Sequence, residues 1–181
     1  LFLKMKGTKG ASRYAKALLD LAVEQKKVDS VLGDMRFLLQ TNNDAREFEL
    51  LIASPIIDAE KKISVFRLVF EQFEEITMSF VELITKNGRE AILPAIAQEF
   101  DAQVKSHKGI VPMTIVSAAP LDQETKNTIV SKVQDAVKGT LEITEEIDEA
   151  LIGGFVVKMG DTQIDASILN QFNNLKQRLT R

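Results

Sequence analysis

Apolar residues recur at helical spacing through the first hundred residues of the chain. Between residues 11 and 22 the apolar positions cover an arc of roughly 240° at 100° per residue, whereas a surface helix needs an arc only a little over about 100°. The polar strip that remains is narrow and holds Arg13, Lys16, Asp20 and Glu24. The pattern predicts a first helix, ending near Glu24, that is buried on more than one side.

Five further helices are predicted before residue 107. Apolar spacing places them at about 28–40, 45–52, 59–70, 73–86 and 92–106. A turn over 41–44, in which Asp44 caps the third helix, separates the second helix from the third, and the Ser54-Pro55 step separates the third from the fourth. Asp58 is predicted to cap the fourth helix, and Asn87-Gly88 to end the fifth. Six helices with short connections predict an all-α bundle over residues 1–106.

The period changes after His107-Lys108-Gly109. Residues 110–116 are rich in β-formers, and Pro112 within them favours an edge strand or an early bulge. A helix follows over 122–138, and residues 141–147 alternate as a half-buried strand should. The order of strands and helices predicts a small α/β domain over residues 107–181, so the whole chain is expected to be α+β.

The stretch from Leu151 to Phe172 is predicted to be a hairpin that leads into an amphipathic helix. Residues 155–157 are β-formers in a run too short for a helix, and 159–161 supply turn chemistry. Asp165 or Ser167 can cap the last helix. The apolar positions of that helix fall at helical spacing: Ile168, Phe172, Leu175 and Leu179.

The same stretch carries a family resemblance. Residues 153–161 read Gly-Gly-Phe-Val-Val-Lys-Met-Gly-Asp, with Asp-Ala-Ser at 165–167, and this run resembles the C-terminal signature of the F-type ATP synthase delta subunit family. The mitochondrial oligomycin-sensitivity-conferring protein belongs to that family. Ser-Arg-Tyr-Ala-Lys-Ala-Leu at 12–18 resembles its opening helix. The resemblance extends from about Met5 and departs at Glu149, where the family often has proline.

Composition excludes several classes of protein. The chain has 181 residues, of which 45% are hydrophobic and 27% charged, and it contains no cysteine. Up to Lys105 it has 15 basic and 16 acidic residues, and beyond it 8 and 10, so neither part has the basic excess that nucleic-acid binding needs. No apolar run approaches the roughly 20 residues of a membrane span. Residues 1–4 do not read as a signal peptide, and we expect Met5 to be the natural start.

The candidate catalytic and metal-binding groups each have a simpler interpretation. His107 is the only histidine, and no motif places a partner beside it. The acidic group at 145, 146, 148 and 149 lacks the ligand spacing of a calcium loop. Asp161 and Asp165 could form the carboxylate pair of a small acid hydrolase, but turn and cap roles explain both. Gly153-Gly154 precedes a strand, so it is not a phosphate loop. We therefore expect no active site, no metal and no cofactor.

The resemblance implies a non-catalytic peripheral-stalk (stator) subunit of the F-type ATP synthase. In this family a groove between the first and fifth helices takes the N-terminal segment of the catalytic head's alpha subunit, and the C-terminal domain meets the b-type stalk helices. The candidate residues for the first contact are Tyr14, Ala15, Leu18, Phe80 and Ile84, and for the second Phe172, Leu175 and Leu179. The implied location is the cytoplasmic face of the bacterial inner membrane. A helical adaptor of another complex and the Asp161–Asp165 hydrolase are the alternatives.

Overall fold

The chain forms two compact units, which are described separately here. The computed structural model describes residues 9–137, 139–148, 151, 153–160, 162–168, 170 and 172. The first unit comprises residues 1–104 and the second residues 105–181. The first contains helices, and the second contains a four-stranded sheet and one described helix. The predicted α+β class is therefore confirmed, and the predicted boundary after residue 106 lies two residues from this division.

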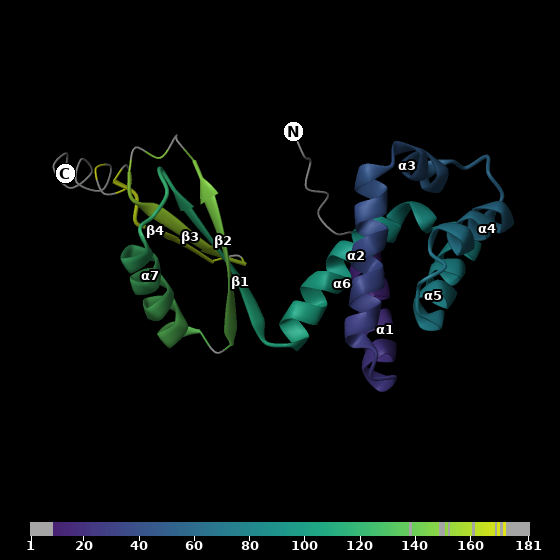
Figure 1. The fold of residues 1–181 in the computed structure, drawn as a ribbon, viewed down its shortest axis with the longest axis horizontal. Helices are drawn as coiled ribbons and strands as arrows, with labels where there is room; N and C mark the ends of the chain where they lie inside the picture. The colour runs from purple at the N-terminus through teal and green to yellow at the C-terminus, as the bar shows by residue number, and fades with distance from the viewer. Residues whose placement is uncertain are drawn as a thin grey trace. The chain divides into compact units, whose positions relative to one another are not determined.

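The first unit is built from helices joined by short connections (Figure 1). Their bounds are α1 (Lys9–Glu24), α2 (Val28–Asp44), α3 (Arg46–Ala53), α4 (Ala59–Val69), α5 (Glu75–Lys86), the 3-10 helix η1 (Glu90–Ile92) and α6 (Leu93–His107). Gly88 has φ +67°, as the C-terminal glycine after α5 requires. Pro94 lies at the second position of α6, where its missing N–H costs little.

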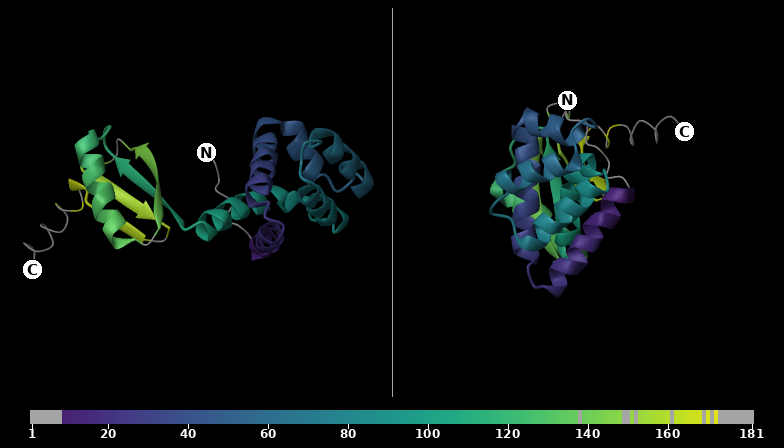
Figure 2. Two further views of the ribbon diagram at one scale, coloured as in Figure 1. Left: turned by 60° about the horizontal axis from the view of Figure 1, so that its bottom comes forward. Right: turned by 90° about the vertical axis from the view of Figure 1, so that its right-hand side faces the viewer.

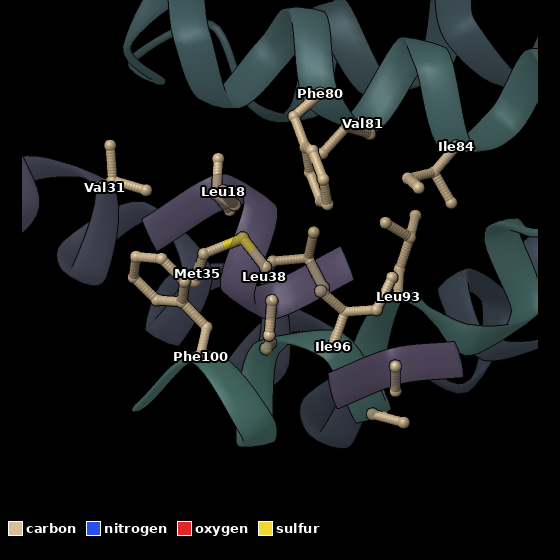
Figure 3. Close-up of a cluster of buried hydrophobic side chains, with 14 of the residues drawn as sticks. Leu18, Val31, Met35, Leu38, Phe80, Val81, Ile84, Leu93, Ile96 and Phe100 are labelled. Carbon is tan, nitrogen blue, oxygen red and sulfur yellow. The ribbon is translucent and has the colours of Figure 1, made fainter. Parts of the chain in front are cut away.

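The core of this unit is one cluster of buried apolar side chains, to which α1 to α6 all contribute. Figure 3 shows Leu18, Met35, Phe80 and Phe100 pointing from α1, α2, α5 and α6 into one shared interior. Leu18, Met35 and Phe100 are fully buried, and Phe80 is 7% exposed. Residues separated by up to about eighty positions therefore meet in a single apolar cluster, which is what holds the helices together.

The first helix is less enclosed than its apolar arc predicts. Its buried residues are confined to one stripe: Ala11, Ala15, Leu18, Leu19 and Ala22. Leu21 and Val23 are 44% and 40% exposed. The prediction that α1 is buried on more than one side is therefore wrong, because α2, α5 and α6 cover only part of the apolar arc.

The predicted turn over residues 41–44 is also wrong. Helix α2 continues to Asp44, and α3 begins at Arg46. Thr41 lies within this helix, since its carbonyl accepts a backbone hydrogen bond of 3.0 Å from the N–H of Ala45, and its Oγ1 donates one of 2.9 Å to the carbonyl of Phe37. The chain breaks at Ala45 alone, which is extended with φ −117° and ψ 102°. Asp44 thus ends α2 and does not cap α3.

The second unit is a mixed sheet with one described helix, α7, against one face (Figure 2). Its elements are β1 (Ile110–Ser117), α7 (Gln123–Ala136), β2 (Thr140–Ile147), β3 (Phe155–Met159) and β4 (Thr162–Asp165), and the strand order is β2-β1-β3-β4. β1 and β2 are parallel, with α7 as their crossover, and the other pairs are antiparallel. Asp122 caps α7 by accepting a 2.6 Å hydrogen bond from the N–H of Thr125.

From the sequence, Pro112 is expected to mark an edge strand or an early bulge, but β1 is not an edge strand. β1 is an inner strand, with β2 on one side and β3 on the other. Pro112 pairs with Glu142 of β2, whereas the pairing with β3 begins only at Thr114. The proline therefore lies beyond the reach of β3, where its missing N–H breaks no bond of the antiparallel ladder.

The Gly-Gly step packs against the end of β4. Gly154 has φ +81°, and a Cβ atom there would lie 2.5 Å from the carbonyl oxygen of Ala166, so only glycine fits. Asp165 accepts a hydrogen bond of 2.9 Å from the N–H of Ser167, and the Ser167 hydroxyl accepts one of 3.2 Å from the N–H of Asn170. Both residues thus satisfy N–H groups where the sequence predicts the last helix to begin.

Candidate partner-binding surfaces

Four of the five predicted head-binding residues lie in the core of the first unit. Ala15, Leu18 and Ile84 are fully buried, and Phe80 is 7% exposed. Tyr14 is half-buried and packs against the edge of the same cluster. In this structure their side chains hold α1 and α5 against the other helices. A partner that docks on the surface of the unit would meet the exposed neighbours of these residues.

Helices α1 and α5 run antiparallel to each other. At one end Arg89, just beyond α5, donates a hydrogen bond of 3.2 Å to the Tyr14 hydroxyl, and its guanidinium lies 5.8 Å from the centre of the Tyr14 ring. At the other end Lys27, just beyond α1, pairs with Glu74, just before α5, at 2.7 Å. Two polar contacts therefore mark the two ends of the strip of surface between the helices.

Apart from Ser79, that strip consists of apolar and aromatic side chains along both helices, and we call it the α1–α5 face. It consists of Tyr14, Ala17 and Leu21 on α1 and of Ile76, Ser79 and Leu83 on α5. In each helix these positions are i, i+3 and i+7, so they share one side. Leu21 is 44% and Leu83 54% exposed. Near Lys27 the face opens into a hollow of about 380 Å³, lined by Gln25, Lys27, Glu75, Ile76 and Ser79.

At the Lys27 end of the face, charged groups hold the two helices together. The hydrogen bond from Lys27 lowers the pKa of Glu74 below its ordinary value, and the same contact raises the pKa of Lys27. Both groups therefore stay charged around neutral pH. The backbone N–H of Glu74 also donates a 2.9 Å hydrogen bond to Asp34 of α2. These bonds hold the start of α5 against the α1–α2 turn.

The second unit has an apolar groove of its own, the α7–hairpin groove, with a volume of about 490 Å³. Phe155, Val157 and Met159 of β3 and Ile164 of β4 form its floor, and Ile129 and Val133 of α7 form its wall. Helix α7 leaves Ile164 half exposed. Phe172, predicted to meet the stalk, is 65% exposed. Leu175 and Leu179 lie outside the described residues.

Of the candidate carboxylate pair Asp161 and Asp165, the structure describes only Asp165. Asp165 is held by the Ser167 hydroxyl and N–H, and these contacts lower the pKa of its carboxyl. A carboxylate held ionised in this way suits a cap and not a general acid. Asp161 and Glu149 lie outside the described residues. Glu145 pairs with Lys126 at 2.8 Å. Among the described residues no group of three or more His, Asp or Glu could hold a metal ion.

In the part of the chain that the structure describes, no helix is long and apolar enough to cross a bilayer.

Sequence reasoning missed the exposed residues Leu21, Leu83 and Arg89. A signal for Leu21 was present, because the apolar arc of α1 is wider than its core contacts require. Periodicity alone does not tell which edge of a wide arc is covered. No sequence pattern indicates a role for Arg89, because its position beside Tyr14 depends on how α1 and α5 pack.

Comparison with known proteins identifies the family. The model of the ATP synthase delta (OSCP) subunit family matches residues 11–179. Among curated proteins, ATP synthase subunit delta of Christiangramia forsetii is 33% identical over 97% of this chain and 95% of its own length. The same subunit of Cytophaga hutchinsonii is 32% identical over 97% of each.

The fold agrees with a solved structure as well. A chain of the mitochondrial ATP synthase hexamer of Toxoplasma gondii superposes with a TM-score of 0.74 at 22% identity, covering 96% of this chain and 99% of that one. The delta family is a structural subunit of the synthase and carries no catalytic site. This chain, by its sequence over nearly its whole length, belongs to the ATP synthase delta (OSCP) subunit family.

Proposed function

We propose that this chain links the catalytic head of an F-type ATP synthase to its peripheral stalk. Membership of the delta family supports a structural role in the synthase. The observation that carries the linking role is that each of the two compact units has its own partly exposed apolar surface, the α1–α5 face and the α7–hairpin groove. A linker needs two such surfaces, because it must hold two partners at once.

The first unit takes the head. In this proposal α1 to α6 act as one six-helix bundle, and the α1–α5 face receives the N-terminal segment of the alpha subunit as an amphipathic helix. Leu21 and Leu83 are exposed apolar side chains against which the partner helix packs, and Tyr14 and Ile76 lie beside them. The buried side chains beneath the face set the distance between α1 and α5. They are Ala15, Leu18, Phe80 and Ile84.

The second unit takes the stalk. The lining of the α7–hairpin groove is mostly apolar, and it also includes Glu124 and Lys132. We place the end of the b-type stalk helices there. Phe172, Leu175 and Leu179 stay the sequence-based candidates for this contact.

No reaction is needed for this role. A rotary synthase makes ATP only if its head is held still while the central shaft turns, so the link must resist torque. Slow dissociation matters more than any reactive group. Two docking sites on one chain also raise the effective concentration of each partner for the other. The protein would act at the cytoplasmic face of the bacterial inner membrane as a peripheral part of the synthase.

Calorimetric titration with a synthetic N-terminal peptide of the alpha subunit tests the head contact. We expect saturable one-to-one binding, lost in the double variant Leu21→Asp, Leu83→Asp, because two carboxylates would be desolvated in the interface. The matched control is Leu68→Asp on α4, which is 81% exposed and lies off the face. Variants of Leu18 or Phe80 would test folding and not docking.

The titration distinguishes an error in the proposed binding site from an error in the proposed function. Binding that survives the double variant would keep the function and reject the α1–α5 face. No binding at high micromolar peptide would count against the stator role, and an adaptor of another complex would become the leading interpretation.

A further inference from the structure

Charges at the two ends of the α1–α5 face have opposite signs. The end near Tyr14 carries Arg13, Lys86 and Arg89, all exposed. Of the carboxylates close to them, Glu82 pairs with Arg67 at 2.6 Å as well as with Lys86 at 4.0 Å, and Glu90 pairs with the buried Lys62. The one carboxylate that Lys86 contacts is thus shared with Arg67, and this end keeps a net basic charge.

The other end is acidic. It carries Asp20 and Glu24 on α1 and Glu74 and Glu75 at the start of α5, against Lys26 and Lys27 in the turn. Because Lys27 is bound to Glu74, three carboxylates face one further lysine there. The hollow beside Glu75 and Gln25 opens at this end.

The helices' own dipoles do not create this difference. α1 and α5 run antiparallel, so the positive end of one macrodipole lies beside the negative end of the other and the two largely cancel. The side chains therefore set the field along the face. A docked helix has a dipole that nothing cancels, with partial positive charge at its N-terminus and partial negative charge at its C-terminus.

From this arrangement we propose that the docked helix has a single orientation, parallel to α5. Its N-terminal end lies at Glu24 and Glu75, and its C-terminal end lies at Lys86 and Arg89. The partner that fits is an amphipathic helix with basic residues near its N-terminus and acidic residues near its C-terminus. This inference rests on the proposed docking of a head segment on the α1–α5 face.

Paramagnetic broadening tests the orientation directly. The N-terminal alpha peptide is prepared with a nitroxide at either end and added to the full-length, isotopically labelled chain. We expect the N-terminal label to broaden the amide signals of Glu75 and Ser79, and the C-terminal label those of Lys86 and Arg89.

Each other outcome contradicts the inference in a distinct way. The reversed pattern, or equal broadening of both ends by each label, overturns the single orientation and leaves the docking site in place. No broadening on the α1–α5 face with either label overturns the docking site, and the orientation with it.

Charge reversal provides an independent measurement. Lys86→Glu should weaken peptide binding by about two- to five-fold at low salt, because it places a negative charge beside the negative end of the docked helix. The effect should shrink as salt screens the charges. Lys61→Glu on α4, also an exposed lysine, is the matched control and should leave binding unchanged. Equal effects of the two variants would contradict the proposed field.

Discussion

Replacing Lys62 with methionine is expected to lower the free energy of unfolding of the first unit by about 3–5 kcal/mol. Lys62 is 1% exposed, and its Nζ pairs with Glu90 of η1 and donates a 2.6 Å hydrogen bond to the carbonyl of Ser54. Methionine fills the volume but removes the charge. The Glu90 carboxylate, whose side chain is 13% exposed, would then be left nearly buried without its cation.

Urea unfolding followed by far-ultraviolet circular dichroism measures this loss. Lys61→Met is the matched control, because that neighbouring side chain is 76% exposed and its removal should change stability by no more than about 0.5 kcal/mol. The double variant Lys62→Met, Glu90→Leu should recover most of the loss, since no buried charge remains. A single variant as stable as the control would show that the buried pair does not tie α4 to η1.

Replacing Phe70 with alanine should be equally damaging, at about 3–5 kcal/mol. Phe70 is fully buried at the end of α4, at the centre of an aromatic cluster. Its ring stacks on Phe73 at 4.4 Å between centroids and meets Phe48 edge-on at 5.5 Å. Alanine would leave a cavity among the aromatic rings around Phe70. These rings can close the cavity only in part, because they already pack against one another.

The same unfolding measurement, applied to two further variants, identifies the cause. Phe70→Leu keeps most of the volume and should cost less than the alanine variant. Leu68→Ala removes a side chain two residues away that is 81% exposed, and it should be close to neutral. If Phe70→Ala were no worse than Leu68→Ala, the aromatic cluster would not be part of the stabilising core.

The helices and strands could largely be predicted from the sequence, because each has a local signal. Asn87-Gly88 ends α5 as predicted, and Asp122 caps α7 with a hydrogen bond to Thr125. The errors arose where a local signal was overruled. Thr41 has a turn-like neighbourhood, yet α2 continues through it to Asp44. Pro112 signals an edge, yet β3 is too short to reach it.

The partner surface was harder to predict than the fold. The candidates Tyr14, Ala15, Leu18, Phe80 and Ile84 came from the family resemblance, which also directed the proposal to α1 and α5. Four of these side chains are buried, however, and Leu21 and Leu83 are exposed beside them. Periodicity shows that a residue is apolar and on which side of its helix it lies. It does not show whether a neighbouring helix covers that side.

Formation of a ternary complex is the most direct test of the linking role. The full chain would be mixed with the N-terminal alpha peptide and a C-terminal fragment of the b-type stalk helices, and the mass of the resulting species measured by analytical ultracentrifugation. The account predicts one species that contains all three components, with the alpha peptide lost on Leu21→Asp, Leu83→Asp and the stalk fragment retained. If either partner displaced the other, the chain could not link head and stalk, and the proposed function would be wrong.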